Sequence, residues 1–175
     1  MKAHAVPPPR QRGSILYMFA FAATLLVAMF AATVDLSQLY ARKTEIQNAA
    51  DAAALAGAKS LKASSGSAAA ISAAVGAATG TSNNYQYANH DKYFSFAPGA
   101  ISFAASATSN NWLSPAAAKL APAGLKFVRV LARDGDSAPL TLATAFASSI
   151  GQGATLTVDA VAVAGPINNG VGLRQ

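Results

Sequence analysis

Hydrophobic side chains form one long uncharged run near the N-terminus, and helix-forming sequence follows it without interruption. Residues 14–34 contain no charged side chain, and their only polar side-chain groups are hydroxyls. No proline occurs between Gly13 and Lys62. About 20 helical residues are enough to cross a hydrocarbon core of about 30 Å. The pattern therefore predicts one continuous helix that spans a membrane over residues 13–34 and continues outside it over residues 35–62.

Positive charges come before this run, and the first acid follows it. Lys2, Arg10 and Arg12 precede the run, and Asp35 comes directly after it. Because Lys and Arg accumulate on the cytoplasmic side of a span, we expect a single span with a cytoplasmic tail over residues 1–12 and the rest of the chain outside. The apolar run is longer than the 7–15 residues of a cleaved signal peptide. This favours an uncleaved signal-anchor, and the other alternative is the core helix of a soluble protein.

The part of the helix beyond the membrane carries an apolar stripe. Its members recur at steps of three and four residues, which places them on one side of a helix. Two interpretations are open: the stripe is the domain's own core seam, or it is a docking face for another helix. A domain of this size favours the core. The stripe consists of Leu36, Leu39, Tyr40, Ile46, Ala50, Ala53, Ala54, Gly57 and Leu61.

Beyond the long helix, the pattern predicts a small α+β domain over residues 63–166. Ser67–Thr79 has the composition of a second, short helix with Ser67 as its N-cap. Alternating apolar and polar residues then predict strands of an antiparallel sheet. The further expectations are a hairpin that joins residues 93–96 to 101–103 through Pro98 and Gly99, loops at 80–89 and 106–122, strands at 125–133 and 155–164, a short helix at 142–149, and a flexible tail at 167–175.

The long helix also carries specific motifs. They are Arg12-Gly13 before the run, Val34-Asp35 at its end, Leu39-Tyr40, and the string Gln47-Asn48-Ala49-Ala50-Asp51-Ala52-Ala53-Ala54-Leu55-Ala56-Gly57. With these motifs the segment resembles the N-terminal part of TadG-like and TadE-like proteins of bacterial Tad (tight adherence, Flp pilus) assembly systems. The resemblance implies an inner-membrane protein with its bulk in the periplasm, and other pilus-assembly proteins as partners in cell adhesion. It implies no biochemical activity.

Gly13 supports an alternative function. A short basic leader that ends in Gly before an apolar helix resembles a type IV prepilin processing site, which usually carries Glu at the fifth residue after the cut. Met18 occupies that position here. The alternative is therefore a pilin-like (pseudopilin) fibre subunit processed after Gly13. A small periplasmic sensor or binding module is a third hypothesis.

Charge and chemistry exclude several classes of function. The net charge is +6, but three of the 13 Lys and Arg precede the span, and those beyond it are scattered rather than gathered in a stripe. A nucleic-acid partner is therefore not expected. The chain has no cysteine and two distant histidines, and it lacks nucleophile and phosphate-loop motifs. We expect no enzyme activity, cofactor, metal or small-molecule substrate, and a homo-oligomer remains possible.

Overall fold

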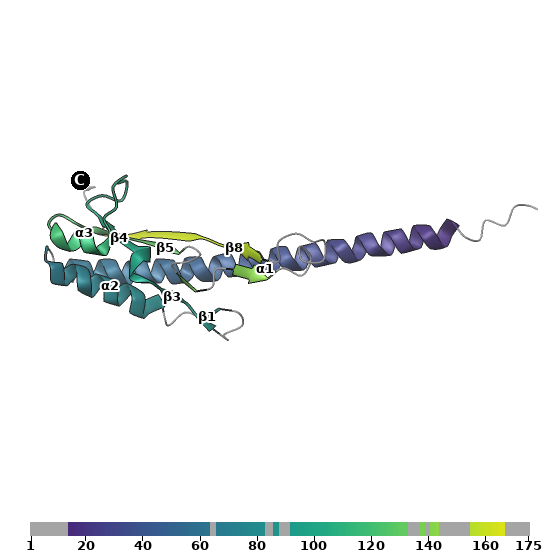
Figure 1. Cartoon of the computed structure of the whole chain (residues 1–175), viewed down its shortest axis with the longest axis horizontal. Coiled ribbons are helices and arrows are strands. Elements are labelled where there is room, and N and C mark those ends of the chain that lie inside the picture. The colour runs from purple at the N-terminus through teal and green to yellow at the C-terminus, as the bar shows by residue number, and fades with distance from the viewer. Residues whose placement is uncertain are drawn as a thin grey trace, which may run out of the picture.

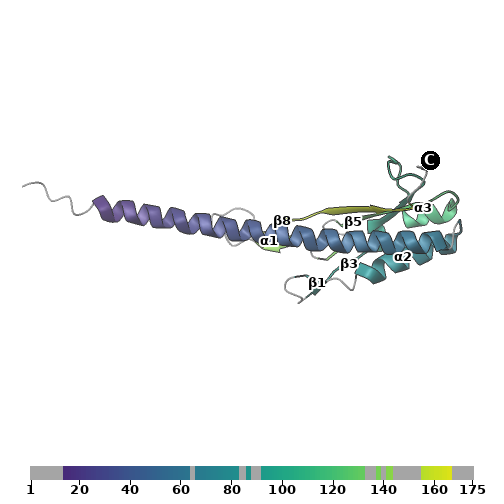
Figure 2. The ribbon, with the colours of Figure 1, turned by 180° about the vertical axis from the view of Figure 1, so that it is seen from behind.

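A single long helix organises the computed structural model, which describes residues 14–63, 66–82, 86–87, 92–132, 137–138, 141–143 and 155–166. Helix α1 (Ser14–Ala63) has 50 residues, which corresponds to about 75 Å at a rise of about 1.5 Å per residue. Its N-terminal half stands clear of the other described elements, whereas its C-terminal half carries them (Figures 1 and 2). The prediction of one uninterrupted helix is confirmed.

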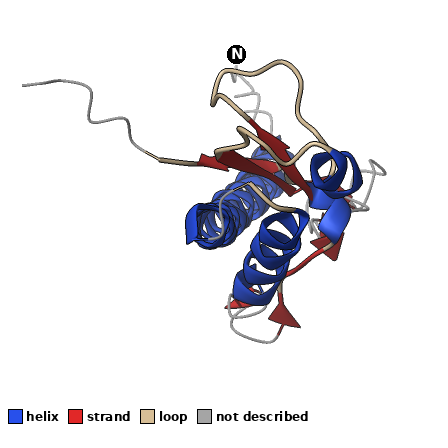
Figure 3. Cartoon of the chain, turned by 90° about the vertical axis from the view of Figure 1, so that its left-hand side faces the viewer, coloured by secondary structure: helices blue, strands red, loops and turns tan. Residues whose placement is uncertain are grey.

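Helix α2 (Ala68–Ser82) folds back along the C-terminal half of α1 (Figures 1 and 3). Ser67 caps it as expected, because its Oγ accepts a hydrogen bond from the backbone N–H of Ala70 at 3.1 Å. The helix continues past Thr79 into the segment predicted to be a loop. Its last turn is held by tertiary structure, since the fully buried Ser82 Oγ donates to the Thr79 carbonyl and accepts from the Phe96 N–H.

A three-stranded antiparallel sheet covers the two helices. Its order is β4 (Ile101–Ala104), β5 (Phe127–Ala132) and β9 (Ala160–Ala164). Burial alternates along β5, so that Val128, Val130 and Ala132 face inward as predicted. The other elements are the pairs β1 (Gln86–Tyr87) with β2 (Lys92–Tyr93), β3 (Ser95–Phe96) with β6 (Ser137–Ala138) and β7 (Thr141–Ala143) with β8 (Thr155–Thr157), the 3-10 turn η1 (Pro98–Ala100) and helix α3 (Pro115–Leu120). The fold is α+β.

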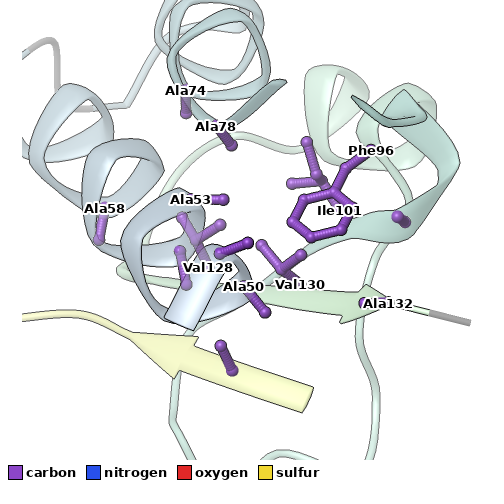
Figure 4. Close-up of a cluster of buried hydrophobic side chains, with 14 of the residues drawn as sticks. Ala50, Ala53, Ala58, Ala74, Ala78, Phe96, Ile101, Val128, Val130 and Ala132 are labelled. Carbon is purple, nitrogen blue, oxygen red and sulfur yellow. The ribbon is translucent and has the colours of Figure 1, made fainter. Parts of the chain in front are cut away.

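The core lies between α1, α2 and the inner face of the sheet. Small side chains line the two helices, and larger ones come mainly from the strands (Figure 4). Alanine adds little apolar area per residue, but it allows helices and strands to approach closely. The larger fully buried side chains are Ile46, Ile71, Phe94, Ile101, Phe103, Val128 and Val130.

The predicted hairpin between residues 93–96 and 101–103 is wrong. Pro98 and Gly99 form the 3-10 turn η1, in which the N–H of Ala100 donates to the carbonyl of Ala97 at 2.9 Å. The flanking strands take distant partners, since β3 pairs with β6 and β4 pairs with β5. The local turn signal was correct, but the strand pairing depends on segments far along the chain.

Three more local predictions need correction. Helix α3 lies inside the predicted 106–122 loop, where Ser114 caps it by accepting from the Ala117 N–H and Pro115 occupies its first turn. Strand β7 occupies the start of the predicted 142–149 helix, and residues 144–150 lie outside the described residues. The predicted 155–164 strand is two short strands with different partners. Both predicted tails lie outside the described residues.

Candidate anchoring and docking helix

The N-terminal half of α1 presents an apolar surface on all sides. No side chain of residues 15–34 is buried, and each large apolar side chain from Ile15 to Phe30 is more than half exposed. The hydroxyls of Thr24 and Thr33 donate to the carbonyls of Ala20 and Phe30. These bonds lower the free-energy cost of placing the two hydroxyls in lipid. By length and composition this helix can cross a membrane. The alternative of a core helix in a soluble protein does not fit, because nothing in the described chain covers it.

The C-terminal half of α1 is tied to the sheet through polar side chains. Lys43 Nζ donates to the carbonyl of Asp159, and Gln47 Nε2 donates to the carbonyl of Val161 at 3.1 Å. Gln47 also donates to Asp51 Oδ1 at 2.9 Å, which orients its amide. Val161 lies in β9, an outer strand of the sheet, and Asp159 directly precedes that strand, so these bonds satisfy backbone carbonyls at an edge that another strand could otherwise pair with. Helix α1 therefore closes this edge of the sheet.

The string Gln47–Gly57 divides into two faces on the helix. Its buried members are all small, and they lie against α2 and the sheet, as Figure 4 shows for Ala50 and Ala53. Asn48, Asp51 and Leu55 are exposed on the other side. Packing thus explains the small residues of the string, but it does not explain the exposed ones. The buried members are Ala49, Ala50, Ala53, Ala54 and Gly57, and Ala52 and Ala56 are half-buried.

Gly57 of α1 lies close to both α2 and β5. A Cβ atom added there would lie 3.2 Å from Val128 Cγ1 and 3.3 Å from the Ala74 carbonyl oxygen. Gly76, on α2, is exposed and would have no atom within 4 Å of an added Cβ. The two helical glycines therefore differ in surroundings while sharing helical backbone.

We expect Gly57→Leu to destabilise the domain and Gly76→Leu to stabilise it slightly. Overpacking a close contact typically costs about 1–3 kcal/mol, and replacing a helical glycine gains up to about 1 kcal/mol. Urea denaturation followed by circular dichroism measures both. Equal effects of the two substitutions would show that Gly57 is not at a tight contact.

The structure brings only some of the sequence-predicted helix residues into the core. Ile46 and Leu61 are buried and Leu39 is half-buried, whereas Leu36 and Tyr40 are exposed. The apolar stripe thus joins the core over most of its length, but not at its N-terminal end. Sequence reasoning missed the role of Lys43 and Gln47, although their polar side chains at the edge of the stripe were a usable signal.

Lys2, Arg10, Arg12 and Gly13 lie outside the described residues, so orientation and processing stay predictions.

The outer face of the sheet carries one organised polar contact. Arg129 Nε donates to Ser102 Oγ at 3.1 Å, and its guanidinium stacks 4.5 Å from the centre of the Trp112 ring. Val161 and Val163 are exposed on the same face. Within the described ranges, no three His, Asp or Glu side chains gather as metal ligands. The chemistry of these surfaces suits contacts with lipid and protein.

Comparison with known families matches the helix rather than the sheet. The matched family is that of TadE/G-like Flp pilus-assembly proteins, and the match covers residues 13–60. This segment is a TadE/G-like domain. The TadE/G-like domain includes the bare half of α1, which is the exposed apolar segment 15–34. It also includes nearly all of the packed half, residues 35–63, and it ends before the strands begin. Neither a curated protein nor a solved structure gave a match to the chain.

Proposed function

We propose that this TadE/G-like protein is a non-enzymatic component of Tad/Flp pilus assembly, anchored in the bacterial inner membrane by one span, with its α+β domain in the periplasm. The observation that carries the proposal is the division of α1, whose matched segment is bare and apolar over one half and packed into a domain over the other. A helix of this kind needs lipid around its first half. It also holds the domain outside the membrane without an intervening linker.

The exposed side of the TadE/G-like domain is the proposed contact surface for other pilus-assembly proteins. Leu55 is 65% exposed although it belongs to the string that carries the family resemblance. Asn48 and Lys59 are exposed on the same side of α1, one turn or two away. The part of the apolar stripe from Ile46 to Leu61 is buried in the domain, so the docking face we propose is on the opposite side of the helix. A helix face with one large apolar residue between polar ones suits a protein partner that itself presents a groove.

In a bacterium that makes Flp pili, loss of this protein should sharply reduce surface pili, and the full-length chain should restore them. Affinity capture from membranes should recover other pilus-assembly proteins. Leu55→Asp should lower that recovery without loss of folded protein, because the Leu55 side chain is largely exposed. Normal pili in the absence of the protein would contradict the proposed function.

The proposed orientation predicts opposite behaviour of two fusions. A reporter enzyme that is active only in the periplasm should work when it is fused after Gln175 and be silent when it is fused before Met1. The reason is that Lys2, Arg10 and Arg12 precede the span and hold that end in the cytoplasm. The reverse pattern of reporter activity would contradict the orientation and the periplasmic role together.

A pilin-like subunit processed after Gly13 is the second candidate. Its support is that Gly13 directly precedes the apolar run in the sequence, so a cut there would leave a chain that starts with the exposed apolar half of α1. Met18, where such subunits usually carry Glu, argues against it. The intact mass of protein purified from membranes separates the two. A mass that lacks residues 1–13 favours the subunit, and a full-length mass favours the anchor.

A further inference from the structure

Strand β9 runs beside α1 in the same direction, which allows heights above the membrane to be compared. Lys43 contacts the carbonyl of Asp159, and Gln47 contacts the carbonyl of Val161. Four helical residues advance about 6 Å, and two strand residues advance nearly 7 Å. The helix and the strand therefore rise together, and residues before Asp159 lie level with residues of α1 before Lys43.

The same comparison places β8 at the membrane end of the domain. Two strand residues correspond to about four residues of α1 in height. Counting back from Asp159 in this way, Thr157 is level with about residue 39 of α1, and Thr155 is level with about residue 35. Figure 1 shows β8 on the side of the domain next to the bare half of α1. Because Thr155 pairs with Ala143, the described end of the β7–β8 pair also lies level with the outer end of the span.

Large apolar side chains are exposed on α1 at this same height. Val34, Leu36 and Tyr40 are 53%, 52% and 64% exposed, and they continue the apolar surface of the span past Asp35. Tyrosine concentrates where bilayers meet water. Tyr17, at the other end of the span, is exposed as well.

The spacing of the two tyrosines fits a bilayer. Twenty-three residues of helix separate them, which corresponds to about 35 Å. This exceeds a hydrocarbon core of about 30 Å but is less than the 40–45 Å that includes both headgroup layers. Tyr17 and Tyr40 can therefore lie in opposite headgroup layers at the same time.

From these heights we propose that phospholipid headgroups reach Tyr40, and that the β7–β8 pair rests on them. The surface consists of Val34, Leu36 and Tyr40 together with the membrane end of β8, and its partner is the lipid leaflet on the domain side. The proposal rests on the membrane anchoring proposed above, since the surface is continuous with the span. The domain then sits directly on the membrane, and no free stalk of helix separates the two.

Spin labels on single cysteines in the full-length protein test this proposal. The chain has no cysteine of its own, and each chosen position is exposed: Leu26, Tyr40, Thr157 and Lys62. In phospholipid vesicles, oxygen reaches labels in lipid preferentially, and a water-soluble nickel chelate reaches labels in water. Lys62 lies about 33 Å beyond Tyr40 along the same helix, so a label at K62C stays in water and serves as the aqueous reference.

We expect the ratio of oxygen to nickel accessibility to be several-fold higher at Y40C and T157C than at K62C, and highest at L26C. Ratios at Y40C and T157C equal to that at K62C, with L26C in lipid, would overturn the lipid contact and leave the anchoring intact. An aqueous ratio at L26C would overturn the anchoring itself and the lipid contact with it.

Discussion

Removal of residues 1–34 is expected to move the protein from the membrane to the soluble fraction with its fold retained. Residues 15–34 contribute no buried side chain, and the first fully buried residue of α1 is Ile46. Nothing in the described core is therefore lost with them. A transmembrane helix gives effectively irreversible insertion, so the redistribution should be nearly complete. Ultracentrifugation after an alkaline wash measures it.

Deleting residues 2–12 alone is the matched control, because it shortens the chain but keeps the span. That variant should stay in the membrane fraction. Circular dichroism of the soluble fragment should show both helix and strand. A disordered fragment would mean that the outer part needs lipid or a partner protein to fold, and it would refute the view that α1, α2 and the sheet form a self-sufficient core.

Ile46→Ala in this fragment is expected to cost about 2–5 kcal/mol of unfolding free energy, which is the usual range for truncating a buried Ile to Ala. Ile46 is fully buried in the core cluster with the sheet and α2. Leu55→Ala removes a side chain of the same size from the exposed side of the same helix, and such surface changes usually stay within about 0.5 kcal/mol. Urea denaturation of the two variants and the parent gives the comparison.

Comparison of the Ile46→Ala and Leu55→Ala variants also decides between the two interpretations of the apolar stripe. A large loss of stability for Ile46→Ala alone supports the core seam. If Ile46→Ala leaves the unfolding free energy unchanged but prevents pilus assembly in cells, the stripe is a docking face. A loss of pili with Leu55→Ala at unchanged stability would instead support the exposed face as the partner surface.

The sequence predicted those elements whose signals are local. Continuous helix-forming sequence without proline indicated α1, Ser67 marked the start of α2, and alternation along residues 127–132 indicated β5 and its inward face. Helix α3 had a local signal too, a Ser followed by Pro at positions 114 and 115, and could have been predicted.

The strand partners could not be predicted in the same way. Pro98 and Gly99 give a turn in either arrangement, and only the distant strands β5 and β6 decide what the flanking residues pair with. The candidate site shows the same division. The bare half of α1 is evident from composition, but the contacts of Lys43 and Gln47 with β9 join residues more than a hundred positions apart.

The continuity of α1 has a mechanical consequence. In the proposed anchoring, no flexible joint separates span and domain, so the helix would pivot as one rigid rod at the membrane surface. Between Asp35 and Ala63 the lever arm is about 42 Å, so a tilt of about 20°, ordinary for a span, would swing its far end sideways by about 14 Å. An axial pull on the span would likewise pass straight into the domain along one continuous helix. A partner that grips either end can therefore move the other.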